Sequence, residues 1–105
     1  MYWMQDREAP FATFLSFVYS YCHPEGRADN FSGFVQRAQR NDLHDVRMVV
    51  FRKELIRLLE GDRKGMPPGS IDLAADYDDF DNDDDFLVWL WQQLYPNEPV
   101  PGHLG

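Results

Sequence analysis

Apolar residues recur along this chain at the spacing of helices. Intervals of three and four residues place side chains on one face of a helix, and no segment of four or more residues alternates strictly between apolar and polar positions. The pattern predicts helices over about 10–22, 31–38, 43–60 and 83–95, and a short one near 70–77. We therefore expect an all-α fold, a compact bundle of four or five helices without an internal repeat.

Turn-forming residues mark the ends of these helices. His23-Pro24 is predicted to end the first helix and residues 25–27 to form a turn, because the residue before a proline avoids helical backbone. Gly61 follows the third helix, where glycine readily takes the left-handed conformation of a helix stop. Asp29 or Asn30 is predicted to cap the second helix, Asp42 with Asp45 the third, and Ser70 the short one. Pro96 is predicted to end the last helix.

The same spacing predicts which faces are buried. The first helix is apolar on more than one side, so it should contact several neighbours. On the third helix the predicted inward residues are Leu43, Val46, Val50, Phe51, Leu55, Leu58 and Leu59, and on the short helix Ile71, Leu73, Ala74 and Tyr77. Residues 1–8 and 96–105 are predicted to fray at the two ends of a single domain spanning 1–105, although Tyr2 and Trp3 are large enough to pack on the core.

Length and composition describe one small domain. The chain has 105 residues, 44% of them hydrophobic and 15% aromatic, which is too apolar for a disordered segment. A single cysteine, Cys22, excludes an internal disulfide, as is usual in a reducing compartment. The first residues lack the basic and apolar regions of a secretory signal, and no apolar run approaches the ~18 residues of a membrane span. We expect a cytoplasmic protein.

The charge is unevenly distributed along the chain. The net charge is −8, yet residues 1–65 hold all ten Lys and Arg against nine Asp and Glu, whereas residues 66–105 hold nine acids and no base. Affinity for phosphate depends on Lys and Arg, so this distribution disfavours nucleic acid as a direct ligand. It favours a basic protein surface, a metal ion, or a role in solubility alone.

Most of the acidic charge lies in residues 72–85, where eight of fourteen residues are aspartate and none is basic. Asp83, Asp84 and Asp85 suit the first turn of the last helix, where carboxylates meet unpaired N–H groups and the positive end of the dipole. Two interpretations of the rest stay open, a solvated loop and a docking surface for a positively charged partner. The candidate partner-binding residues are Asp76, Tyr77, Asp78, Asp79, Phe80, Asp81 and Asp83.

Metal and catalytic motifs are missing from the sequence. A calcium-binding EF-hand loop needs glycine at position 6 and glutamate at position 12, and frames starting at Asp79 or Asp81 have neither, which leaves only a loose cation site. Zinc would have to use Cys22, His23, His44 and His103, but the adjacent Cys22 and His23 point about 100° apart on a helix and do not form a ligand pair. No nucleophile elbow, phosphate loop or HExxH motif is present, so we expect neither an enzyme nor a bound cofactor.

Three segments carry a family resemblance. The first segment is similar to an aromatic motif, Phe-Leu…Tyr-Phe-His-x-Asp, and consists of Phe14-Leu15 through Tyr21-Cys22-His23-Pro24-Glu25. Glu54-Leu55-Ile56-Arg57-Leu58-Leu59 resembles a Leu-rich middle helix, and 86–94 an aromatic last helix that follows an acidic segment. Together they resemble small acidic immunity proteins of bacterial contact-dependent growth inhibition systems. Cys22 stands where an aromatic residue is usual, and Glu25 where aspartate is usual.

The resemblance implies a cytoplasmic protein that binds and inactivates a toxin domain delivered by a neighbouring cell, often a nuclease acting on RNA. It implies no catalytic residue, and it assigns no contact position, because such interfaces vary strongly between members. Two alternatives of other classes stay open beside it. One is an acidic adaptor or regulatory domain unrelated to toxins, and the other is a structural domain that depends on a cation.

Overall fold

A proline placed directly after an extended residue separates two of the helices. In the computed structural model, α2 (Ala12–Cys22) ends at His23, whose extended backbone (φ −60°, ψ 137°) is the conformation that a following proline favours. Pro24 then begins α3 (Pro24–Gln39), a position where its missing N–H needs no partner. The predicted turn at 25–27 is therefore wrong, because these residues form the first turn of α3.

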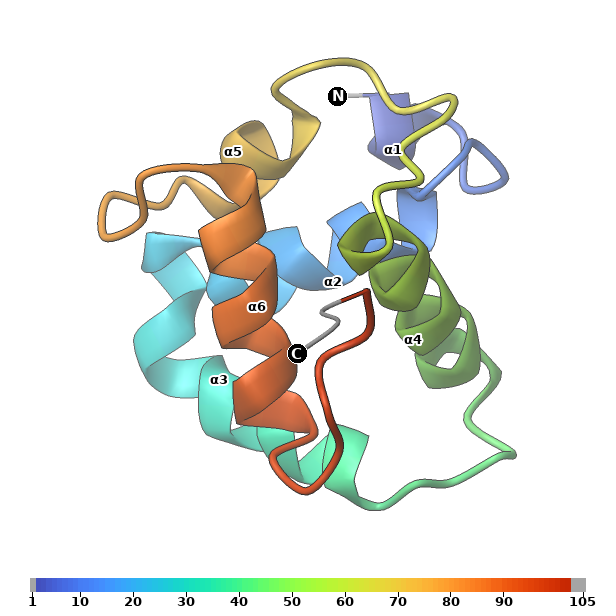
Figure 1. Ribbon diagram of the computed structural model, residues 1–105, viewed down its shortest axis with the longest axis vertical. Helices are drawn as coiled ribbons and strands as arrows, with labels where there is room; N and C mark the ends of the chain where they lie inside the picture. Colours follow the sequence, from blue (N-terminus) through green and yellow to red (C-terminus); the bar gives the residue numbers. More distant parts are fainter. Residues whose placement is uncertain (1, 103–105) are drawn as a thin grey trace.

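The structure describes residues 2–102, except for the side chains of Tyr2 and of residues 24–29. Beside α2 and α3 it contains α1 (Tyr2–Gln5), α4 (Val46–Leu59), α5 (Ser70–Ala75) and α6 (Asp83–Leu94), arranged as in Figure 1. Residues 2–102 contain no β-strand, so the predicted all-α bundle is confirmed. Across this same range, every helix is too short or too polar to traverse a lipid bilayer.

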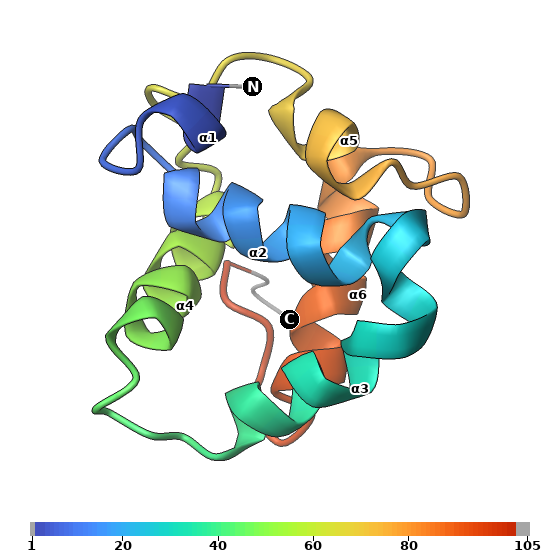
Figure 2. The same ribbon diagram turned by 180° about the vertical axis from the view of Figure 1, so that it is seen from behind.

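Helix α2 lies at the centre of the bundle and contacts α1, α3, α4 and α5 (Figure 2). Six of its eleven residues are buried, which confirms the expectation that it packs against several neighbours. Phe17 lies at the middle of this contact, 5.8 Å from the ring of Phe34 in α3 and 5.4 Å from that of Phe51 in α4. Helix α6 completes the bundle by packing against α3 and α4.

Helix α4 begins later than predicted and buries only part of the predicted face, with Phe51, Leu55 and Leu58 inward as expected. Asp45 is its N-cap and accepts a hydrogen bond from the backbone N–H of Met48, so residues 43–45 precede the helix. Phe51, Leu55, Leu58 and Met48 are buried, whereas the predicted inward residues Leu43, Val46 and Val50 are 79%, 68% and 36% exposed. At 100° per residue, Val46 and Val50 lie on the side of the helix opposite the core.

Helix α5 also differs from its prediction in detail. Its N-cap is Gly69 in the left-handed conformation (φ 80°), and the Ser70 hydroxyl donates to the carbonyl of Pro67 instead of capping the helix. Ile71 and Ala74 are buried as predicted, but Leu73 faces solvent and is 58% exposed.

The two ends of the chain pack on the bundle more closely than predicted. Trp3 is buried in the core, so the expected fraying of 1–8 does not hold there, while Met1 and the side chain of Tyr2 lie outside the described residues. The segment after α6 folds back along α4 (Figure 1), where both oxygens of Glu98 pair with Arg52 at 2.6 and 2.7 Å. A side chain at Gly102 would collide with the carbonyl of Leu59, so the predicted loose tail is wrong for 96–102; residues 103–105 lie outside the described range.

A carboxylate from α4 supports the start of α2. Phe11 precedes α2 with left-handed backbone (φ 62°) and provides no side-chain cap. Instead, Glu54 Oε1 accepts a hydrogen bond from the backbone N–H of Phe14 at 2.9 Å, forty residues away in sequence. Burial raises the pKa of the Glu54 carboxyl above its ordinary value, against the opposing effects of its backbone hydrogen bonds and of Arg57. Glu54 thus joins α4 to the first turn of α2.

Removing this carboxylate should destabilise the fold. We expect Glu54→Ala to lower the free energy of unfolding by about 1–2 kcal/mol, because the Phe14 N–H loses its acceptor in a partly buried site. Glu54→Gln keeps an oxygen acceptor and should lower it less. Urea denaturation at pH 7 measures both changes.

The pH dependence of stability tests the raised pKa. The folded state binds the Glu54 proton more tightly than the unfolded state does. Its contribution is fully present below the unfolded pKa of about 4.3 and is lost as pH rises through the higher folded pKa. Between pH 7 and about 4.5, wild type should therefore gain stability relative to Glu54→Gln as the pH falls. Parallel pH profiles for the two proteins would contradict the assignment.

Candidate functional site

The acidic segment, residues 72–85, joins α5 to α6. Asp72 lies on α5 and Asp83, Asp84 and Asp85 form the first turn of α6, as predicted. Between the two helices the chain forms a loop that projects from the body of the molecule, and both Figure 1 and Figure 2 show it extending past the ends of its neighbours. The acidic segment is therefore a protrusion with a helix at either end.

The two aromatic residues of the segment hold the loop on the core. Tyr77 stacks on Phe86 of α6 with ring centroids 5.5 Å apart and planes inclined by 12°. The Phe80 ring contacts Phe86 in a T-shaped arrangement and Trp89 at a tilt, with ring centroids 5.6 and 5.4 Å apart. Both Tyr77 and Phe80 are half-buried, so only part of each ring is available to a partner. Their role as partner anchors stays a prediction, whereas their contacts within the fold are direct.

A hydrogen bond closes the same loop. The Tyr77 hydroxyl donates to Asp83 Oδ1 at 2.6 Å and so ties the start of the loop to the first turn of α6. Burial, the hydrogen bond and the charge of Asp83 together raise the pKa of Tyr77 well above its ordinary value. The phenol therefore stays protonated and remains a donor at any physiological pH.

The carboxylates of the loop point outward. Asp76, Asp78, Asp79 and Asp81 are all exposed. Asp76 has left-handed backbone (φ 47°) and lies 3.8 Å from His23 Nε2, at the end of α2. Within residues 2–102, no hydrogen bond or ion pair engages the side chains of Asp78 and Asp81. These two carboxylates are the ones most available to an incoming cation.

Asn82, which the sequence reading overlooked, is the actual cap of α6. Its side-chain oxygen accepts from the backbone N–H of Asp85 at 2.9 Å, as an N-cap residue does. Asparagine directly before three helix-starting acids was a signal that could have identified it. The three carboxylates are then free for other contacts, and Asp84 pairs with Arg63 from the connector before α5. One base from the first part of the chain thus reaches the acidic segment.

The acidic segment brings exposed carboxylates together on one protrusion. Across the described residues, no three His, Cys, Asp or Glu side chains come close enough together to hold a metal ion. A groove of about 270 Å³ lies elsewhere, between the end of α3, α4 and Tyr95. The segment itself presents dense carboxylates on an aromatic base, which can form charge-assisted hydrogen bonds with Lys and Arg.

Comparison of the chain with protein-family models, curated protein sequences and solved structures finds no match to any of them. The structure itself defines the class, a small all-α protein with a projecting acidic segment.

Tyr77→Phe tests how the loop is held. The substitution keeps the stack on Phe86 and removes only the bond to Asp83, so we expect the free energy of unfolding to fall by about 1 kcal/mol. Amide protons of residues 76–82 should also exchange faster with solvent. Tyr19→Phe is a suitable control, because the Tyr19 ring contacts His23 but its hydroxyl makes no hydrogen bond within the described chain. Equal stability and exchange in both variants would contradict the role of the Tyr77 hydroxyl.

Proposed function

We propose that this protein is an immunity protein that binds a toxin domain in the cytoplasm and neutralises it. The toxin is a nuclease of the contact-dependent growth inhibition type. The observation that supports this most strongly is the display of exposed carboxylates on a loop held by Tyr77, Phe80 and the Asn82 cap. The three segments that resemble the immunity family correspond to α2 with the start of α3, to α4, and to α6.

The electrostatics of the two partners complement each other. A nuclease holds an anionic substrate and must present Lys and Arg around its cleft. A protein carrying net charge −8, with its carboxylates concentrated in one protrusion, is steered towards such a surface before contact. Steered association reaches ~10⁸–10⁹ M⁻¹s⁻¹ at low salt. Once bound, the acidic segment excludes the nucleic acid by its volume and its charge.

The loop between α5 and α6 is held in one conformation by contacts within the fold, which favours its use as a binding surface for the toxin. A flexible acidic loop would lose conformational freedom on binding, which weakens the complex. Here Tyr77 and Phe80 already pack on Phe86, and Asp83 is already bonded to Tyr77. Asp78 and Asp81 can therefore meet the partner with little rearrangement of the backbone that carries them.

Removing charge from the loop should slow association with the toxin. The probe is the product of the gene directly upstream of the one for this chain, the position in which the toxin of an immunity protein is expected. We expect Asp78→Asn with Asp81→Asn to lower the association rate constant about 3- to 10-fold at low salt, because two steering charges are lost. Adding Asp76→Asn and Asp79→Asn should lower it further and flatten its dependence on salt. Stopped-flow or surface-based kinetics measures these rates.

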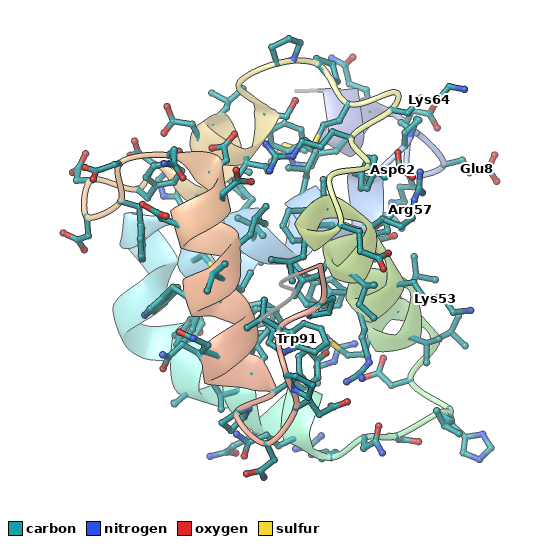
Figure 3. The ribbon with its side chains drawn as sticks, in the orientation of Figure 1. Glu8, Lys53, Arg57, Asp62, Lys64 and Trp91 are labelled. Atoms are coloured by element: carbon teal, nitrogen blue, oxygen red, sulfur yellow. The ribbon has the colours of Figure 1, made fainter. Side chains whose placement is uncertain are left out.

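The matched control removes the same net charge from elsewhere. Glu8 and Glu60 are exposed and lie outside the acidic segment, with Glu8 on the opposite side of the view in Figure 3. The pair Glu8→Gln and Glu60→Gln should leave the rate nearly unchanged. Equal slowing in both double variants would show that net charge, and not the acidic segment, governs binding. Absence of any complex with the product of the upstream gene would overturn the proposed function.

A further inference from the structure

The outer face of α4 is apolar where a solvent-facing helix is usually polar. Val46 and Val50 lie one turn apart on the side away from the core, and Leu43 precedes them on the connector. These three are among the most exposed large apolar residues in the part of the chain that the structure describes. Neighbouring residues of this kind mark interaction surfaces more often than scattered ones do. We refer to Leu43, Val46 and Val50 with their flanking bases as the α4 face.

Two bases flank this apolar strip. At 100° per residue, Arg47 falls on one side of Val46 and Val50, and Lys53 on the other. Both bases are exposed, and in residues 2–102 no carboxylate forms an ion pair with either of them. The guanidinium of Arg47 lies 5.0 Å above the ring of Phe17, so it is turned toward α2, on that flank of the strip. The α4 face is therefore apolar at its centre, with Lys53 on one flank and Arg47, turned toward α2, on the other.

The acidic segment of the same chain has the complementary character. Leu73 is 58% exposed beside Asp72, and the half-buried Phe80 lies among exposed carboxylates. The two surfaces lie on opposite sides of the molecule, since the acidic loop and α4 project in opposite directions in both Figure 1 and Figure 2. In Figure 3, Lys53 extends from α4 away from the body of the protein. One copy therefore cannot bring its own two surfaces together.

We propose that the α4 face binds the acidic segment of a second copy of this chain, in a head-to-tail contact. Such a contact pairs two different surfaces, so an open assembly keeps one unused surface at each of its two ends. It places Arg47 and Lys53 opposite carboxylates and covers Val46 and Val50. The inference concerns the protein alone and does not rest on the toxin.

The net charge of the protein opposes this contact and weakens it. Each copy carries −8, so two copies repel at long range. At an ionic strength of about 0.15 M the repulsion is screened beyond roughly 8 Å, while pairs in direct contact are screened less. A small contact surface opposed by residual repulsion gives a weak, reversible association. Because it covers the acidic segment, a basic partner for that segment competes with it directly.

Sedimentation equilibrium of the purified protein tests the association. Over about 20 to 500 µM at about 0.15 M salt, we expect the weight-average mass to rise with concentration to at least roughly 1.5 times the 12.4 kDa of one copy. Val46→Glu with Val50→Glu should return the protein to a single copy, and so should Asp78→Lys with Asp81→Lys. Met4→Ser is the control, since it removes an exposed apolar side chain from α1 and should leave the association unchanged.

Mixing the two double variants distinguishes head-to-tail contact from any other. Each variant has lost a different surface, so an equimolar mixture should form a complex of two copies and nothing larger. All four proteins are first compared by circular dichroism and urea denaturation, to confirm that each is folded. A wild-type protein that stays at 12.4 kDa throughout would overturn the proposal. So would an unchanged association in either double variant, or a mixture that remains as single copies.

Discussion

The structure depends on the burial of α2 among its neighbours. Its aromatic side chains meet Phe34 from α3 and Phe51 from α4, and Glu54 from α4 accepts the hydrogen bond that its first turn requires. Aromatic residues bury the largest areas of any side chain, which lets a chain of 105 residues form a stable core without a disulfide. Helices α3 and α4 then provide the surface on which α6 packs.

Packing of α6 in turn determines the shape of the acidic segment. Phe86 and Trp89 of α6 face the loop, so they provide an apolar surface on which Tyr77 and Phe80 pack. Repulsion between closely spaced aspartates, on the order of 1 kcal/mol per close pair in water, would otherwise favour an extended loop. The aromatic contacts and the Tyr77–Asp83 hydrogen bond oppose this tendency. The segment can therefore concentrate its charge and remain ordered, which is the property a docking surface needs.

Both proposed partners of the acidic segment share one chemistry. A nucleic-acid-binding cleft and the α4 face each combine exposed Arg or Lys with a surface that excludes water on contact. Arg37 and Arg52 contribute little to such binding, since each is already paired with a carboxylate of its own chain, Asp45 and Glu98. The bases available for partners are those that the fold leaves at its surface, and their positions follow from which face of α4 is buried.

Local spacing along the chain was sufficient to predict the all-α class, the packing of the first helix against several neighbours and the place of the acidic segment, whereas the caps Asp45 and Asn82 differ from the predicted ones. The correct predictions follow from local spacing, which a periodic pattern records directly. Tertiary structure decided which side of α4 faces the core, because that helix has apolar residues on two sides and periodicity cannot choose between them. It also decided that Phe80 packs inward on Phe86 and Trp89 and that Glu98 pairs with Arg52, forty-six residues away. Contacts between distant residues depend on how the helices assemble, and no local pattern contains that information.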